Sequence, residues 1–384
     1  MMRVLIVYHA GAMIGARQIF RELADVKGME LTVVVPEKLK VDRVYDSSGW
    51  LCVEKEECAD GYRMVPLPLR DLSHYWKGFE SKPLRRFIRK IQPDITHVFD
   101  EPMSGYIFQV VQACLFGCRR SKVLFYGFEN VPFHLRIRSR LKWKLKWALM
   151  SGGVAANSEA LENVKRAGFP SGRLLERIFW GVSTQTFKPM DGARLKTRLG
   201  LDYERIVGFV GRLVPEKGLL VLLAALRRLP ENVHCLIIGS GPMRAELEMW
   251  SGLPELLGRI HFYDIMGSDM LARYMNCMDV LAVPSLTTAS WKEQYGRVIV
   301  EAMACGVPVV GSDSGAIPEV IDSAGLIVPE GDVSSFVEAL NTAIFDSEAH
   351  DRFRQRGLQR VDQELSVRAM ADKLSSFYGR VLAN

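Results

Sequence analysis

Short apolar runs alternate with segments of helical length along nearly the whole chain, and this alternation restricts the fold more than any other feature. In the first half, the apolar runs span residues 4–8, 31–35, 95–99, 123–126 and 153–156. The clearest helical segments between them are 15–25, 104–116 and 141–150. Buried strands that are separated by helices predict a parallel sheet with helices on its faces.

The second half repeats the pattern more regularly. Its apolar runs span residues 206–210, 233–238, 259–262, 280–283, 307–310 and 326–328. A chain of 384 residues is long enough for two domains. The expected fold class is therefore α/β with two Rossmann-like doubly wound domains, over residues 1–185 and 186–366. Residues 36–75 interrupt the first domain with Pro, Gly and charge and predict loops with a short hairpin, whereas 367–384 predict a terminal amphipathic helix.

Composition predicts a cytoplasmic protein. No run of eighteen apolar residues is present, and the N-terminal apolar run is typical of a buried strand, not of a signal peptide. The seven cysteines have no framework spacing, which favours reduced thiols over disulfides. The sequence also lacks an Asp-x-Asp triplet, which argues against a site in which paired carboxylates hold a bridging metal ion.

Charge is uneven along the chain. Residues 1–185 carry 29 Lys+Arg and 19 Asp+Glu, a net of +10, whereas residues 186–384 carry 21 and 25, a net of −4, and the two add to the total of +6. A basic half predicts a partner with negative charge. Nucleic acid, an anionic bilayer surface and a lipid diphosphate all meet that requirement.

The segment 134–147 holds six basic residues interleaved with apolar ones. Trp143 and Trp147 are i,i+4 neighbours, and Arg138, Lys142 and Lys146 form a cationic row on a helix. Such a helix suits a bilayer interface. An ordinary amphipathic helix with core tryptophans and solvated cations explains it equally well. Residues 82–90 add further cations to the same half of the chain.

Two carboxylates stand eight residues apart in the stretch from Glu293 to Glu301, with Gly296 between them. If a helix carries them, both face one edge of it, and unpaired amides at its N-terminus attract phosphate. A sugar on Glu293, a diphosphate on the amides and a ribose on Glu301 fit this geometry. The alternative is a surface helix with two unrelated glutamates.

A second motif, Gly211 to Gly218, follows an apolar run and precedes a helical segment. Arg212 supplies planar donors and Lys217 a compact charge, a combination that suits two adjacent phosphates. Ligands of open parallel sheets bind at the carboxyl ends of strands, which favours phosphate binding over a solvated loop.

Together these motifs resemble the large family 4 of retaining glycosyltransferases, which have the GT-B fold of two Rossmann-like domains facing a central cleft. The resemblance implies that Arg212 and Lys217 neutralise a leaving nucleoside diphosphate, that Glu293 contacts the sugar and that no metal is needed. It also implies that the terminal helix packs back on the first domain. The donor-binding residues that we expect are Gly15, Gly211, Gly296, Arg297, Val298, Glu301 and Ile265.

The chain departs from the family pattern in the first domain. No histidine stands at the position that many relatives use, where the sequence reads Gly127-Phe-Glu129-Asn130. Asp100, Glu129 or Asn130 could orient the sugar or the acceptor instead, although Glu129 could equally serve as a local cap. Asp264 replaces a frequent glycine near the expected base site, so the base stays open between UDP and GDP.

The function expected from the sequence is a metal-independent, retaining glycosyltransferase without a cofactor. It would use a UDP- or GDP-sugar and a glycan or lipid-linked acceptor, in bacterial cell-envelope or exopolysaccharide synthesis, peripherally on the inner face of the membrane. The alternatives are a nucleotide-sugar epimerase or hydrolase, or a non-catalytic binding protein. A nucleic-acid partner is not expected, because the donor motifs are all present.

Overall fold

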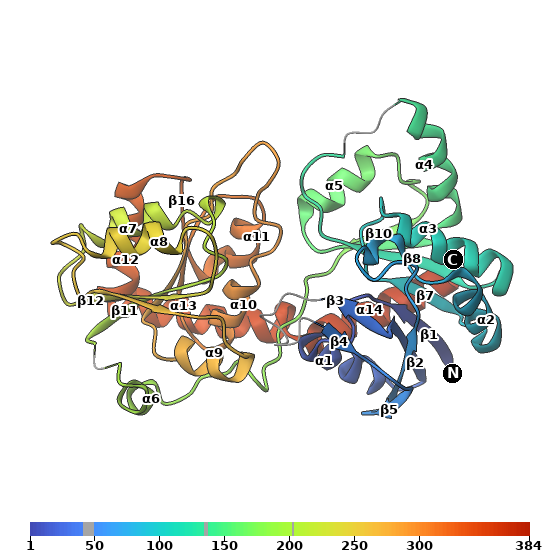
Figure 1. Ribbon diagram of the computed structural model, residues 1–384, viewed down its shortest axis with the longest axis horizontal. Coiled ribbons are helices and arrows are strands. Elements are labelled where there is room, and N and C mark those ends of the chain that lie inside the picture. The colour runs from blue at the N-terminus through green and yellow to red at the C-terminus, as the bar shows by residue number, and fades with distance from the viewer. Residues whose placement is uncertain (41–49, 134–136, 202) are drawn as a thin grey trace. The chain divides into compact units, whose positions relative to one another are not determined.

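The computed structural model describes residues 1–40, 50–133, 137–201 and 203–384, which form two compact units. Unit 1 consists of Met1–Gly181 and Val367–Asn384, and unit 2 consists of Val182–Ser366. In each unit helices cover both faces of a mainly parallel sheet (Figure 1). The prediction of an α/β fold with two doubly wound sheets is confirmed.

The sheet of unit 1 has eight strands. In spatial order they are β10 (Leu174–Arg177), β9 (Gly152–Ala155), β8 (Lys122–Gly127), β7 (Ile95–Val98), β1 (Met2–Val7), β2 (Met29–Pro36), β6 (Tyr62–Leu67) and β5 (Glu57–Ala59). All neighbours are parallel except β5 and β6. The chain order therefore reverses direction between β1 and β7.

Alternating residues of β1 enter two different cores. Val4 and Ile6 face the core formed with α1 (Ile14–Ala24) and α14 (Val367–Ala383). Leu5 and Val7 face the opposite core, as the two-residue period of a strand requires. The helices on that second face are α2 (Ser81–Ile91), α3 (Gly105–Gly117), α4 (Ile137–Leu149) and α5 (Ser158–Arg166).

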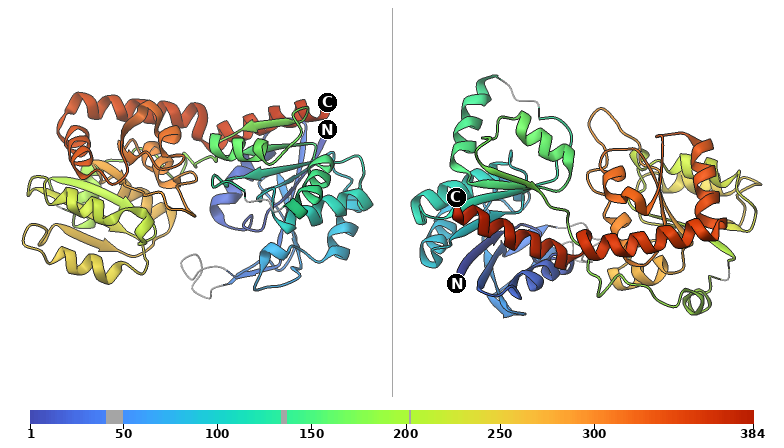
Figure 2. Two further views of the ribbon diagram at one scale, coloured as in Figure 1. Left: turned by 90° about the horizontal axis from the view of Figure 1, so that it is seen from above. Right: turned by 180° about the vertical axis from the view of Figure 1, so that it is seen from behind.

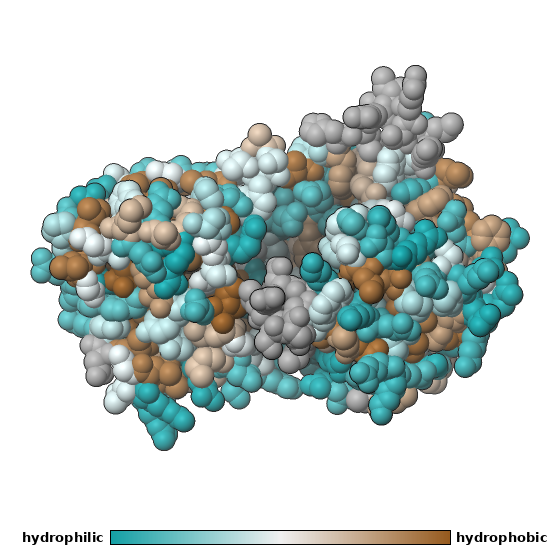
Figure 3. Space-filling view, viewed as in Figure 1, coloured by the Kyte–Doolittle hydropathy of each residue, from teal (hydrophilic) through white to brown (hydrophobic). Residues whose placement is uncertain are grey.

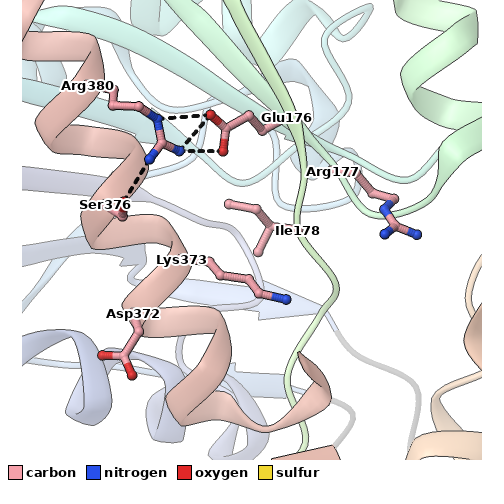
Figure 4. Close-up of a pocket in the computed structure, with 7 residues that line it drawn as sticks. All are labelled: Glu176, Arg177, Ile178, Asp372, Lys373, Ser376 and Arg380. Carbon is pink, nitrogen blue, oxygen red and sulfur yellow. Dashed lines mark hydrogen bonds and ion pairs between the residues drawn. The ribbon is translucent and has the colours of Figure 1, made fainter. Parts of the chain in front are cut away.

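The terminal helix α14 is an integral part of unit 1 (Figure 2). Tyr378 is buried, and its hydroxyl lies 2.8 Å from Nδ1 of His97, a fully buried strand residue. Burial lowers the pKa of His97 to about 3, so this histidine is a neutral core residue. Arg380 pairs with both oxygens of Glu176 on β10 beside a shallow pocket of about 350 Å³ (Figure 4).

The prediction for residues 36–75 is only partly right. Strands β3 (Lys38–Lys40) and β4 (Trp50–Cys52) form a separate antiparallel pair, and residues 41–49 between them lie outside the described part. However, β6 extends the main sheet beside β2 and is not part of a loop. The β6 run is short and contains Pro66, which is disfavoured within central strands, so the pattern did not reveal it.

Helix α4 follows the ordinary amphipathic alternative at the positions that the structure describes. Trp147 is buried, and its Nε1 donates to the carbonyl oxygen of Ala167 at 3.0 Å. Lys146 is half-buried, with Nζ 4.0 Å from the ring centre of Trp143, and burial lowers its pKa. Lys146 thus packs against Trp143, and the predicted cationic row stays a prediction, because the side chains of Arg138 and Lys142 lie outside the described residues.

The six strands of unit 2 are all parallel. In spatial order they are β13 (Ile260–Tyr263), β12 (Val233–Ile238), β11 (Arg205–Val210), β14 (Val280–Val283), β15 (Val309–Ser312) and β16 (Gly325–Val328). Counted within the unit, this order is 3-2-1-4-5-6, that of dinucleotide-binding folds. The chain order reverses between β11 and β14.

Helices cover both faces of this sheet (Figure 1). One core includes residues of α7 (Leu219–Leu226), α8 (Arg244–Ser251) and α12 (Val333–Phe345). The remaining helices are α6 (Gly192–Leu199), α9 (Ser268–Met275), α10 (Arg297–Ala304), α11 (Ile317–Ile321) and α13 (Ser347–Arg360). Short 3-10 turns span Tyr75–Lys77 (η1), Pro215–Lys217 (η2) and Asp322–Ala324 (η3), and a π-helical turn spans Val361–Leu365 (η4).

Surface hydrophobic residues occur in small groups among hydrophilic ones on the face shown in Figure 3. Within the described residues, no helix has both the length and the apolar character that crossing a bilayer requires.

Candidate functional site

Loops that follow β11, β14 and β15 meet at one edge of the unit 2 sheet. Because the chain order reverses between β11 and β14, this edge contains the switch point at which open α/β sheets bind ligands. Hydrogen bonds join the loops: the amide of Leu286 donates to the carbonyl oxygen of Glu216 at 2.8 Å, and the hydroxyl of Ser312 to that of Ser285 at 2.5 Å. The sequence therefore builds a fixed edge from three neighbouring strands.

Gly218 allows the loop after β11 to approach the loop after β14. Its φ of +67° is in the left-handed region, and a Cβ atom at this position would lie 1.8 Å from the carbonyl oxygen of Pro284. Only glycine fits both conditions. The close approach brings the preceding residue, Lys217, next to the segment that contains Glu293.

Lys217 and Glu293 form an ion pair at this edge, with Nζ 2.5 Å from Oε2. Glu293 is 7% exposed, and its Oε2 also accepts a hydrogen bond of 3.1 Å from the hydroxyl of Ser285. The Lys217 ammonium lies 4.8 Å from the ring centre of Trp291. An ammonium has three donors, so Lys217 can bind a further anionic oxygen while it holds Glu293.

Glu293 lies in the loop before the helix that carries Glu301, so helical spacing does not align the two carboxylates. Helix α10 begins at Arg297, and its N-cap is Gly296 with φ +71°, so Glu293 lies in the loop three residues earlier. The loop is held by the carbonyl oxygen of Glu293, which accepts from the amide of Ala316 at 2.9 Å. The direction of the Glu293 side chain therefore follows from loop contacts and not from helical spacing.

Glu301 is the fifth residue of α10, at the start of its second turn, and is 4% exposed. Burial raises the pKa of this carboxyl, and the neighbouring Arg297 opposes the increase through an ion pair of 3.1 Å. Arg212 belongs to the same edge but is largely exposed, with its guanidinium 3.5 Å from Glu216. An exposed guanidinium and a partly buried, ion-paired ammonium thus belong to one loop.

The structure therefore gathers most of the expected donor residues on one edge. These are Gly211, Arg212, Lys217, Glu293, Gly296, Arg297, Val298 and Glu301. Ile265 differs, because it follows β13 at the far side of the sheet, two strands from β11, and is 40% exposed. No described contact connects Ile265 to the Lys217–Glu293 pair.

The remaining candidates belong to unit 1. Gly15 is the second residue of α1 and therefore lies in the helix, not in the turn that precedes it. Glu129 accepts from the amide of Val131 at 2.9 Å, which is the local cap that we considered as the alternative. Asn130 is buried and donates to Glu159 at 3.2 Å. Asp100 accepts from the amide of Glu101, and burial raises its pKa.

Sequence reasoning missed two members of the unit 2 edge, Ser285 and Trp291. Ser285 directly follows Pro284 at the end of β14, and a polar residue at a strand end next to a switch point was the available signal. Trp291 had no such signal, because its place over Lys217 depends on the course of the loop. Among the described residues, no group of three or more His, Cys, Asp or Glu side chains is placed to hold a metal ion.

Comparisons with known proteins agree with this geometry. The profile of the family described as "Glycosyl transferases group 1" matches residues 194–360. A D-inositol 3-phosphate glycosyltransferase of Mycobacteroides abscessus is 33% identical over 217 residues, which are 53% of this chain and 46% of that protein. The enzyme of the same name from Mycolicibacterium gilvum is 41% identical over 145 residues, covering 36% and 31%. The matched part thus spans less than half the length of each relative.

Solved structures share the fold over the whole chain. Sucrose-phosphate synthase from Thermosynechococcus elongatus has a TM-score of 0.76 at 19% identity, with 100% of both chains covered. Anabaena HepE in complex with UDP and glucose has a TM-score of 0.72 at 18% identity, covering 99% and 100%. Such identities establish the fold alone, which is that of GT-B glycosyltransferases. Within this GT-B-type chain, residues 194–360 match the family described as glycosyl transferases group 1.

Proposed function

We propose that the chain is a retaining glycosyltransferase that moves a sugar from a nucleotide-diphosphate sugar to a hydroxyl of a glycan or lipid-linked acceptor. The observation that carries the proposal is the Lys217–Glu293 pair at the unit 2 switch point, beside the N-terminus of α10. Nucleotide diphosphates suit such an edge, because helix-terminal amides and a lysine both attract phosphate.

Leaving-group stabilisation is the main catalytic task in this proposal. Lys217, Arg212 and the first amides of α10 would bind the diphosphate, whose negative charge increases as the bond to the sugar breaks. Glu293, which holds Lys217, would accept hydrogen bonds from the sugar hydroxyls, and Glu301 would accept them from the ribose. The departing phosphate would take the proton of the acceptor hydroxyl, so neither a metal ion nor a separate protein base is required.

We propose a UDP-sugar as the donor. The titles of the HepE structures name UDP and UDP-glucose as ligands of that protein, which supports a uridine nucleotide in a related fold. The base would then lie near Ile265, which follows β13 and is 40% exposed.

The proposal predicts that UDP stabilises the chain against thermal unfolding more than GDP or ADP does. At a UDP concentration of 100 times Kd, the free energy of unfolding should rise by about 2.7 kcal/mol. EDTA should leave this shift unchanged. Failure of all three nucleotides to stabilise the protein would contradict a donor site, and release of UDP from UDP-glucose that no acceptor accelerates would favour a hydrolase instead.

We also propose that unit 1 binds an anionic membrane surface from the cytoplasmic side, as expected for envelope or exopolysaccharide synthesis. The surface we assign to this is helix α2, which buries Leu84 and Ile88 and exposes five cations. These are Lys82, Arg85, Arg86, Arg89 and Lys90, and none makes an ion pair with a described side chain. Phe116, 66% exposed, is adjacent, because its carbonyl oxygen accepts from Arg89.

Replacement of Arg85, Arg86 and Arg89 by serine should weaken binding to vesicles that contain phosphatidylglycerol by roughly 100-fold, since each cation near such a surface contributes about 1 kcal/mol. Flotation of vesicles at low salt measures the change. A control removes the same charge from exposed positions of unit 2, with Arg194, Arg198 and Arg352 replaced by serine. Equal losses in both triple variants would mean that total charge, and not α2, determines membrane binding.

A further inference from the structure

Unit 1 has a switch point of its own, between β1 and β7. Val7 pairs with Val98 across these strands, and Val98 pairs with Phe125 of β8. The residues that follow are therefore neighbours at one edge: His9 after β1, Asp100 and Glu101 after β7, and Glu129 after β8. The position is equivalent to the one that holds the Lys217–Glu293 pair in unit 2, so it is a candidate ligand site on topology alone.

Three buried polar atoms at this edge have no hydrogen-bond partner among the described residues. They are Nδ1 of His9, Oε2 of Glu101 and the hydroxyl of Tyr106. The other oxygen of Glu101 is well paired, because it accepts from the amides of Phe128 at 2.6 Å and Glu129 at 3.1 Å. Native proteins leave few buried polar atoms unpaired, so three at one switch point indicate that a hydrogen-bonding ligand completes them.

Aromatic rings pack around two of the three residues, His9 and Tyr106. His9 stacks on Tyr75 with ring centres 4.2 Å apart and meets the edge of Tyr106 at 6.4 Å. Trp76 lies 5.5 Å from Tyr75 and is 51% exposed. Flat apolar rings around a few fixed polar atoms are typical of a small-molecule site, and they suit a ligand with both C–H faces and hydroxyl groups.

Burial shifts the pKa values of Glu101, His9 and Asp100 toward their uncharged forms. Burial raises the pKa of Glu101 to about 8 and lowers the pKa of His9 to about 4. Burial also raises the pKa of Asp100. Lys146 of α4 donates to the carbonyl oxygen of Ser104 at 3.4 Å and not to the unpaired atoms. Carboxyls without a paired cation disfavour a phosphate at this position.

We infer that Glu101, His9 and Tyr106 bind an uncharged polyhydroxyl ring, a hexose or cyclitol unit of the acceptor. Glu101 donates from its protonated oxygen to a ring hydroxyl, while His9 and Tyr106 pair with neighbouring hydroxyls, and Trp76 contacts the C–H face. The inference deepens the proposed function by naming the class of acceptor. It rests on the proposed function, because only a transferase would use this ring as an acceptor.

Tyr106→Phe separates a ligand-binding role from a structural one. Removal of an unpaired buried hydroxyl should raise the midpoint of thermal unfolding whatever its role. If the hydroxyl binds the ring, the same variant should weaken binding about 3-fold to 10-fold, the contribution of one hydrogen bond. Tyr126→Phe is the matched control, because the Tyr126 hydroxyl is buried and donates to Ile178 at 2.5 Å, so this variant should lose stability and keep binding.

Calorimetry with the full chain and UDP measures the binding. The probes are the methyl glycosides of glucose, galactose, mannose and N-acetylglucosamine, together with myo-inositol, glucose 6-phosphate and inositol 1-phosphate. At least one uncharged probe should bind more tightly than either phosphate. No binding by any uncharged probe, tighter binding of a phosphate, or an unchanged Kd in Tyr106→Phe would each overturn the inference.

Glu101 provides the second test. Glutamine keeps both a donor and an acceptor and thus imitates the protonated acid, so Glu101→Gln should stay within about 2-fold of the wild type, whereas Glu101→Leu should lose about 10-fold. Equal losses in both variants would overturn the assignment of a neutral carboxyl. UDP binding in the same samples distinguishes the two proposals. If the protein binds UDP but none of the ring compounds, only this inference is contradicted. If it binds a ring compound but not UDP, the proposed donor site is contradicted.

Discussion

Replacement of Lys217 by methionine should lower kcat/KM for sugar transfer by about 100-fold to 1000-fold. This is the loss that follows when one preorganised donor to a developing negative charge is removed. The structure adds a second effect, because the partner carboxylate of Glu293 would remain buried without a cation. An unpaired buried charge costs about 3 kcal/mol of stability or more. A loss of activity in the single variant could therefore come from lost catalysis or from partial unfolding.

The double variant Lys217→Met, Glu293→Gln resolves this ambiguity. It removes the buried charge together with the ammonium, so urea unfolding should return to near the wild-type midpoint while transfer stays low. Lys196→Met is the matched control, since Lys196 lies 3.5 Å from Asp279 in a similarly sheltered pair away from the edge. It should lose stability and keep kcat/KM. Wild-type turnover in the double variant would contradict the role of Lys217 in leaving-group stabilisation.

Gly218→Ala should destabilise unit 2 by about 3 to 5 kcal/mol, the sum of left-handed backbone strain and an unavoidable overlap. The overlap is with the carbonyl oxygen of Pro284, 1.8 Å from the new Cβ atom. Relief requires that the loops after β11 and β14 move apart, which separates Lys217 from Glu293. UDP binding should therefore weaken even at temperatures at which the variant is folded.

Gly200→Ala is a close control for Gly218→Ala. Gly200 also has φ +67° and also ends a helix, but no atom lies within 4 Å of its added Cβ. It should therefore lose only the backbone contribution, about 1 kcal/mol, and bind UDP normally. Urea unfolding and calorimetry measure both variants. Equal destabilisation in the two would mean that the contact with Pro284 does not constrain the edge.

The fold was predictable because its strands are buried on both faces and therefore appear as continuous apolar runs, such as those of β1 and β12. Strand β6 escaped prediction for the opposite reason. It contains a proline and lies between a parallel and an antiparallel neighbour, so neither period nor composition marked it.

Site residues that lie close to the end of a strand could be predicted from the sequence. Contacts that depend on the path of a long loop could not. Lys217 and Gly218 follow β11 directly, and their motif was visible in the sequence. The contact between Lys217 and Glu293 was not, because they are 76 positions apart and the chain between them contains three strands and a loop whose direction is fixed by tertiary hydrogen bonds. Burial, which raises the pKa values of Glu101 and Glu301, likewise emerges only from packing.

Unit 1 is discontinuous in sequence, since its last helix is encoded after the whole of unit 2. During synthesis the ribosome must deliver residues 182–366 before α14 can cover the apolar side of α1. Until then Ile19 and Leu23 remain partly exposed, and the nascent chain has an apolar surface to which chaperones can bind. Premature termination anywhere in the second half would thus leave not one finished lobe but an incomplete one, prone to aggregate.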